Sequence, residues 1–218
     1  MAAAGPVVAD SARMNRVLFV AFGMLACWQT SGAAGLLEGK ALYAVCAGCH
    51  GFQAEGNQAV GAPKLTGLDS AYIARQLRYF EDGTRGAHEA DLHGQRMAPF
   101  ALALEDDRAI EDVVGYIETL PHERPAPTLA GDAGRGGQSY ALCAACHGLN
   151  GQGNAQLSAP ALTGLDDWYM VSQLELYRAG ARGADPADTY GQQMRPIVGT
   201  LRDEQQLLDL AAYIGSLE

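Results

Sequence analysis

Basic side chains are scarce in this 218-residue sequence, which has 15 Lys and Arg against 25 Asp and Glu and a formal net charge of −10. The residues from 35 onward carry a formal charge of −11, because the preceding segment contains two arginines and one aspartate. This excess of carboxylates argues against nucleic acid as a partner and against electrostatic binding to an anionic membrane. It is compatible with steering toward a basic partner, and equally with a surface that only keeps the protein in solution.

Cysteine is scarce outside two short motifs. Four of the five cysteines lie in Cys-Ala-Gly-Cys-His at residues 46–50 and Cys-Ala-Ala-Cys-His at residues 143–147. The fifth, Cys27, has no other cysteine left to pair with. The sequence therefore excludes a small domain held together by disulfides.

Long apolar runs are also missing. The apolar run at residues 17–28 is short for a membrane span. Arg13 and Arg16 precede it and small residues at 31–34 follow it, which is the order of a secretory signal peptide.

We therefore expect residues 1–34 to be a signal peptide that is cut after Ala33 or Ala34, with Met14 as an alternative start of translation. Two other interpretations stay open. In the first, the segment is retained as an uncleaved membrane anchor. In the second, Cys27 is a poor lipoprotein acylation site. Periplasmic export is the main expectation, and membrane anchoring is the alternative.

The two five-residue motifs have the C-x-x-C-H pattern that attaches a c-type haem. In each motif the two thiols add to the porphyrin vinyl groups, and the adjacent histidine is held under the iron as an axial ligand. A structural zinc site would need a fourth ligand at metal-finger spacing, and none lies nearby. A redox-active dithiol would need a strand–helix context, whereas alanine-rich helical sequence flanks both motifs. The covalent candidates are Cys46, Cys49, Cys143 and Cys146, and the candidate iron ligands are His50 and His147.

A methionine follows each of these histidines at the same distance. Met97 lies 47 residues after His50, and Met194 lies 47 residues after His147. Each stands three residues after a glycine and two before a proline, so we expect an irregular loop to present its thioether. A sixth ligand of this kind raises the reduction potential, because soft sulfur favours ferrous iron.

The chain repeats itself without a gap at an offset of 97 residues. Matching positions include both motifs, Pro63 with Pro160, and Arg85 with Arg182. A period this long that occurs twice indicates duplicated domains and not a solenoid. We expect domains at residues 35–120 and 130–218, joined by a stiff proline-rich linker at residues 121–129.

Helical patterns dominate both repeats. Asp69-Ser70 and the acids at residues 105–107 are typical of helix N-termini. Neither repeat offers a convincing strand, so we expect an all-α fold in each domain. The expected helices cover residues 36–46, 69–82 and 105–120 in the first repeat and 134–143, 166–180 and 202–217 in the second.

Together these features resemble class I cytochromes c, and the tandem arrangement resembles the dihaem cytochromes c4, over nearly everything from Leu36 to Glu218. The resemblance implies two small helical domains, each wrapped around one covalently bound haem c. It implies that the Pro63 and Pro160 carbonyls accept the Nδ1–H of the ligand histidines, which fixes each ring. It also implies that the first and last helices of each domain cross at a glycine.

The resemblance further implies a periplasmic electron carrier with two His/Met-ligated haems. Its partners would be redox proteins, namely a quinol-oxidising complex and a terminal oxidase or reductase, with no small-molecule substrate and no nucleic acid. One alternative is a dihaem subunit fixed within a membrane oxidase or dehydrogenase complex. A dihaem peroxidase is disfavoured, because a methionine in each half leaves no open position on either iron. Membrane association is expected only through a retained N-terminal segment.

Several residues have two interpretations. His93, in the polar loop before the first methionine, is a rival iron ligand. Arg85 and Arg182 either meet haem propionates through charge-assisted hydrogen bonds or are solvated loop arginines. Trp168, which replaces an alanine of the first repeat, either shapes one haem edge or fills core. His122, in the linker, is expected to be solvated.

Overall fold

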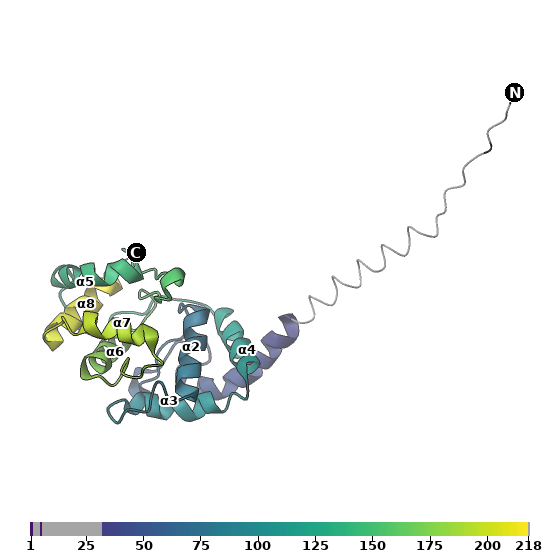
Figure 1. The fold of residues 1–218 in the computed structure, drawn as a ribbon, viewed down its shortest axis with the longest axis horizontal. Helices are drawn as coiled ribbons and strands as arrows, with labels where there is room; N and C mark the ends of the chain where they lie inside the picture. Colours follow the sequence, from purple (N-terminus) through teal and green to yellow (C-terminus); the bar gives the residue numbers. More distant parts are fainter. Residues whose placement is uncertain (2–4, 6–31, 218) are drawn as a thin grey trace.

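A computed structural model of the chain describes residues 1, 5 and 32–217 (Figure 1). The predicted signal peptide falls almost entirely outside the described residues. The described part is helical and has isolated bridges at Asn57–Ala62 and Asn154–Ala159 in place of strands. The expected all-α fold is confirmed. None of the helices described is both long enough and apolar enough to cross a membrane.

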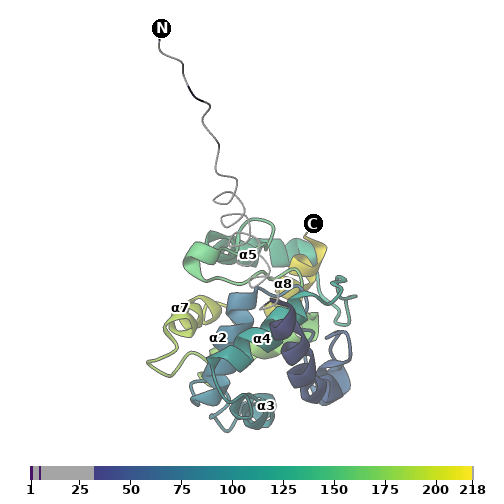
Figure 2. The same cartoon turned by 90° about the vertical axis from the view of Figure 1, so that its right-hand side faces the viewer.

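Both repeats build the same series of elements. In the first repeat these are a helix over residues 32–50, the 3-10 turn η1 (Gln58–Val60), α2 (Ser70–Glu81), α3 (Leu92–Leu102) and α4 (Asp107–Glu118). In the second they are α5 (Ala133–His147), η2 (Ala155–Leu157), α6 (Asp167–Ala179), α7 (Thr189–Val198) and α8 (Glu204–Ser216). The two halves lie side by side, and both views place α2 between α7 and α4 (Figures 1 and 2).

Helix caps account for the ends that the sequence predicts. The Asp69 side chain accepts a hydrogen bond from the Tyr72 amide at 3.0 Å, and Asp106 accepts one from the Ala109 amide at 2.8 Å. Each bond satisfies a backbone donor that has no partner within the helix. The predicted ends of α2 and α4 are therefore correct to within two residues.

The methionine-bearing segments differ from expectation, because they form the helices α3 and α7 and not irregular loops. Asp91 and Asp188 are buried and cap these helices. Their side chains accept hydrogen bonds from the Gly94 and Gly191 amides, each at 2.8 Å. A proline lies inside each helix, where it removes one backbone donor and ordinarily ends helical pairing. The caps and the packing of both helices outweigh that loss, which the local sequence pattern did not indicate.

The first and last helices of each domain cross at a glycine, as the resemblance implied. A Cβ added at Gly39 would overlap the Asp112 carbonyl, and a Cβ added at Gly136 would overlap that of Asp209. Tilted aromatic pairs flank both crossings, with ring centroids 5.5 Å apart for Tyr43–Tyr116 and 5.2 Å apart for Tyr140–Tyr213. The crossing positions the C-x-x-C-H motif, because the motif ends the first helix of each domain.

Each domain has its own apolar core. Most of the largest fully buried side chains lie on the last helix of each domain: Ile110 and Val113 on α4, and Leu207, Leu210 and Ile214 on α8. Burial of such aliphatic side chains is the main stabilising term in a fold of this size. The two cores are separate clusters, so the contact between the domains is of a different kind.

Candidate haem sites and the interface between them

The structure gathers every predicted site residue into one of two pockets. The walls of the first pocket include Cys46, Cys49, His50, Pro63 and Met97. The walls of the second pocket include Cys143, Cys146, His147, Pro160 and Met194. The pairing of residues within each set follows the repeat, so each domain contributes one complete set.

The two histidines are buried and held in one orientation. His50 Nδ1 lies 2.7 Å from the Pro63 carbonyl oxygen, and His147 Nδ1 lies 2.8 Å from that of Pro160. A ring that donates its Nδ1–H keeps the lone pair of a neutral imidazole on Nε2, which is the form that binds a metal. Burial lowers the pKa of both rings, and the carbonyl contact offsets this only in part. The lowered pKa of both rings favours the neutral imidazole, the form that binds a metal.

The motif thiols do not have the character of a redox dithiol. Burial raises the pKa of the Cys46 thiol, and it raises that of Cys143 to about 11. Reactive dithiols have a lowered pKa, because the thiolate is the nucleophile. Cys49 and Cys146 are exposed, so each motif has one thiol inside the pocket and one at its mouth.

The remaining walls fit an apolar group that carries carboxylates. Aliphatic side chains at matching positions line both pockets, among them Leu65 and Leu77 in the first and Leu162 and Leu174 in the second. Each pocket also includes a buried arginine, Arg85 or Arg182, whose Nε has no hydrogen-bond partner among the described residues. A buried cationic donor without a partner is costly unless an anion meets it. A porphyrin with propionate groups meets both requirements.

Met97 and His93 both line the first pocket, on the same helix α3. Met97 is half-buried and packs against the first core, as Met194 packs against the second. His93 is exposed, and its ring lies against Gly61, where a Cβ would overlap it. The methionines thus occupy equivalent environments in the two domains, whereas His93 lies at the surface of one.

A reciprocal set of hydrogen bonds joins the two domains. Arg85 donates to Gln76 of its own domain at 2.6 Å and crosses to Tyr169 and Gln173 at 2.9 and 2.8 Å. Arg182 repeats the arrangement in reverse. It donates to Gln173 at 2.9 Å and crosses to Tyr72 and Gln76, at 3.0 and 2.8 Å. The six side chains form a buried polar bridge with approximate two-fold symmetry.

The bridge corrects one of the two interpretations of the arginines. Both are buried, with exposed fractions of 7% and 6%, so they are not solvated loop residues. The bridge could not be predicted from the sequence, because its partners lie far apart along the chain. The available signal was the recurrence of a glutamine on a helix face that is otherwise apolar, at Gln76 and Gln173.

Each domain also supplies part of the other domain's pocket wall. Trp168 and Ser172 on α6 line the first pocket, and Arg75 on α2 lines the second. Trp168 therefore shapes a pocket edge, and the pocket belongs to the opposite domain. The linker adds a further contact, because His122 Nδ1 lies 3.1 Å from Lys64 Nζ, although the ring is otherwise exposed as expected.

Comparison with known proteins places this geometry in a family. The sequence model for cytochrome c matches residues 36–121 and again residues 133–218. A thiosulfate dehydrogenase electron acceptor of Stutzerimonas stutzeri is 32% identical, over 88% of this chain and 96% of its own. The cytochrome c4 of Azotobacter vinelandii is 30% identical, over 94% of this chain and all of its own.

Solved structures agree. The crystal structure of reduced recombinant cytochrome c4 from Pseudomonas stutzeri superimposes with a TM-score of 0.66 at 26% identity, over 84% of this chain and 98% of the other. Two matched domains, each with its C-x-x-C-H motif, mean two haem c groups, attached through Cys46 and Cys49 and through Cys143 and Cys146.

Proposed function

The chain belongs to the cytochrome c family, with the tandem arrangement of the dihaem cytochromes c4, and we propose that it is an exported electron carrier with no substrate of its own. Electron transfer by two haem c groups follows from the family. Export, free diffusion between partners and His/Met ligation at both irons are the parts that we propose.

The observation that carries the proposal is the paired presence of a histidine and a methionine in each pocket. His50 and Met97 in the first domain, and His147 and Met194 in the second, would hold the two irons. With these residues as its two axial ligands, each iron would have no position left for peroxide or another substrate, and a bound haem would supply one-electron redox chemistry. The thioether raises the reduction potential, which suits a carrier that delivers electrons to an oxidase or reductase.

The pocket mouths support contact with redox proteins. Val45, Val60 and Phe100 are exposed and line the first pocket, and their equivalents Leu142, Leu157 and Ile197 line the second. Each apolar rim lies in a chain of net charge −10 and contains no exposed carboxylate. We propose that partners dock at these rims, so that electrons enter and leave where the pocket is open.

The partners that we propose are a donor of the dehydrogenase or quinol-oxidising type and an acceptor of the terminal oxidase or reductase type. The donor half is supported by the relative that is named as an electron acceptor of thiosulfate dehydrogenase. Fractionation distinguishes a free carrier from a fixed subunit. A free carrier appears as a dihaem protein in the detergent-free soluble extract of the native cells, whereas recovery only within a membrane complex would contradict the proposal.

The ligand assignment is tested with methionine variants. Met97→Ala and Met194→Ala should each remove half of the methionine–iron charge-transfer absorbance of the ferric protein and lower one of its two potentials. His93→Ala, the matched control on the same helix, should leave both haems low-spin with that absorbance intact. A high-spin first haem in His93→Ala, together with an unchanged spectrum in Met97→Ala, would assign the ligand to His93.

A further inference from the structure

Each domain contributes residues to the pocket wall of the other domain, and the two contributions are not equivalent. With the offset of 97 residues, α2 and α6 are matching helices, and Tyr72 and Gln76 correspond to Tyr169 and Gln173. Arg75, however, corresponds to Ser172. Arg75 lines the second pocket and Ser172 lines the first, so among the described residues the opposite domain supplies a cation to the second pocket and not to the first.

Contacts from the second domain hold Arg75 in place. Its Nη2 donates to the Ser158 carbonyl at 3.0 Å, and its guanidinium carbon lies 4.4 Å from the ring centroid of Tyr190. The ring centroid of Tyr72, on the same helix as Arg75, lies 5.4 Å from the guanidinium carbon. The guanidinium carries a fixed charge and is well suited to stacking on aromatic rings. Arg75, a residue of α2, thus forms part of the wall of the second pocket.

Nothing among the described residues neutralises this charge. Arg75 is half-buried, forms no ion pair there, and its Nε is buried without a hydrogen-bond partner. A cation in such surroundings acts on nearby charge much more strongly than one in water.

The other charges of the two pockets largely cancel in the comparison. Arg85 and Arg182 are equivalents, and so are the buried caps Asp91 and Asp188. The first pocket has an additional cation, Arg96, where the second has a glutamine, and an exposed histidine, His93, where the second has Tyr190. Arg96 is exposed, so water and salt screen its effect. The difference that remains is the half-buried guanidinium at the second pocket.

We propose that Arg75, a residue of the first domain, raises the reduction potential of the haem in the second domain through its charge. Reduction adds one electron and lowers the charge of the haem by one, and a neighbouring buried cation stabilises the form with the lower charge. The first haem lacks this contribution, because Ser172 is uncharged. The inference rests on the proposed carrier function, since it concerns two haems that both cycle between oxidation states.

The test is a redox titration of the intact dihaem protein by NMR, in which each haem is followed by its hyperfine-shifted methyl signals. Trp168 and Leu157 line different pockets, so contacts to them identify the signals of the first and second haem. Arg75→Gln should lower the potential of the second haem and leave the first nearly unchanged. Arg75→Lys keeps the charge and should retain most of the wild-type value.

Two matched variants control for charge and for dielectric environment. Arg78→Gln removes the same charge one turn along α2, where the side chain pairs with the exposed Asp107 at 2.6 Å, and it should move neither potential. Arg96→Gln should lower the potential of the first haem by less than Arg75→Gln lowers that of the second. Ser172→Arg should raise the potential of the first haem, which keeps the proposal testable if Arg75→Gln disturbs the interface.

The outcomes separate this inference from the proposed function. If the wild-type protein has two low-spin haems that cycle reversibly but Arg75→Gln leaves the second potential unchanged, or lowers both equally, the role of Arg75 is refuted and the carrier function stands. An equal loss in Arg75→Lys would show a steric role and also refute it. If one wild-type haem is high-spin or does not cycle, the carrier function itself fails.

Discussion

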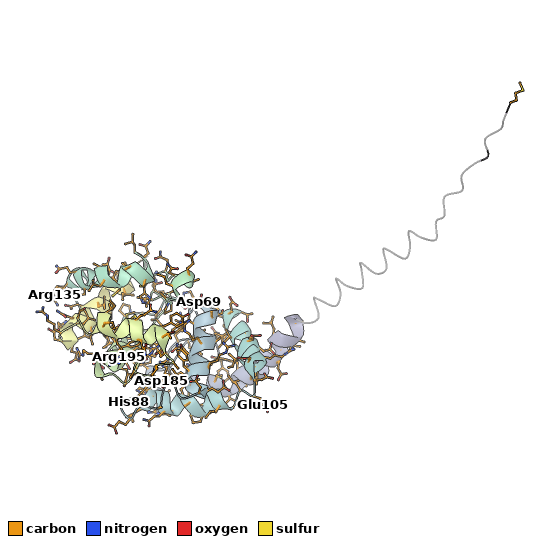
Figure 3. All side chains as sticks on the ribbon, in the orientation of Figure 1. Asp69, His88, Glu105, Arg135, Asp185 and Arg195 are labelled. Carbon is orange, nitrogen blue, oxygen red and sulfur yellow. The ribbon has the colours of Figure 1, made fainter. Side chains whose placement is uncertain are left out.

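The two domains build the same helix crossing but hold it in different ways. In the second domain, Arg135 on α5 binds Asp209 on α8 through two bonds, Nε–Oδ2 at 2.6 Å and Nη2–Oδ1 at 3.0 Å. The Asp132 amide donates to the same carboxylate at 2.8 Å. This bidentate ion pair therefore ties the first helix of the domain to its last. Figure 3 shows Arg135 at the outer end of the second domain, on the side away from the first.

The first domain has like charges at the same positions. The offset of 97 residues puts Glu38 where the second domain has Arg135, and Asp112 where it has Asp209. Asp112 pairs along its own helix, with Arg108 at 3.4 Å, and Arg108 is largely exposed. The fold therefore does not depend on the ion pair. What both domains share is the close backbone approach at Gly39 and Gly136, so that approach defines the crossing.

The largest effect is expected where the domains agree. Gly39→Ala and Gly136→Ala each place a methyl group against the backbone of the facing helix, which must move, so each should cost its domain about 3 kcal/mol. Gly115→Ala on α4 is the matched control. Apart from its chain neighbours and its own helix backbone, no atom of the described residues lies within 4 Å of its added Cβ, and the substitution should stabilise the helix slightly. Denaturant unfolding followed by haem absorbance measures all three, and equal stabilities would show that the crossing tolerates a side chain.

The sequence predicts the parts of the fold that depend on local chemistry. The motifs and the caps at Asp69 and Asp106 each depend on a few neighbouring residues or on the repeat itself. The glycine crossings join helices that lie far apart in the sequence, and they were expected only from the resemblance to a known family. The helices α3 and α7 were not predicted, because each contains a glycine and a proline and depends on a buried aspartate cap and on tertiary packing. Local propensity is a weak guide where packing decides.

The interface was less predictable still. Arg85 and Arg182 look identical in the repeat, and their partners across the interface lie 84 to 110 residues away. A repeat shows which residues are equivalent, but it does not show that two equivalent surfaces face each other. Exchanged wall residues such as Arg75 and Trp168 cannot be assigned to a pocket until the two domains are placed together.

The ion pair of the second domain can be removed there and built into the first. Arg135→Ala should weaken the second domain alone, by less than Gly136→Ala does, because Asp209 keeps the Asp132 amide and Gln205 as partners. Glu38→Arg should strengthen the first domain by giving Asp112 a partner across the crossing. Hydrogen exchange of α8 and α4 measures the two domains separately. A loss of protection in both helices after Arg135→Ala would mean that the domains do not open independently.

Acid should remove the stabilisation that this ion pair gives to the second domain. The Arg135 guanidinium and the hydrogen bonds to Asp209 hold the pKa of that carboxyl well below its usual range. A lowered folded-state pKa stabilises the domain fully above the unfolded value of about 3.9, and the stabilisation is lost as the pH falls through the folded value. Between neutral pH and about pH 3, the wild-type second domain should therefore lose more stability than Arg135→Ala loses, because the variant lacks most of the difference between the folded and unfolded pKa of Asp209. Urea midpoints that fall in parallel for both proteins would contradict this.

The smallest expected effect concerns the contact between the linker and Lys64 of the first domain. Lys64 is buried, with an exposed fraction of 5%, and its backbone amide donates to Asp166 of the second domain at 2.8 Å. The equivalent residue of the second domain is Ala161. His122 Nδ1, 3.1 Å from the Lys64 ammonium, can accept a hydrogen bond from it only while the imidazole is neutral.

Burial, and then the Lys64 charge, lower the pKa of His122, with Arg124 adding to the effect. The linker contact is therefore complete above the unfolded value of about 6.5 and is lost as the pH falls through the lower folded value. Because the ring is largely exposed, the change should appear in its own titration more than in global stability. Lys64→Ala should raise the pKa of His122 in an NMR titration toward that of a free histidine. Lys40→Ala, which removes the same charge from an exposed site, should leave it unchanged, and an equal shift in both variants would mean that Lys64 acts only through the net charge of the protein.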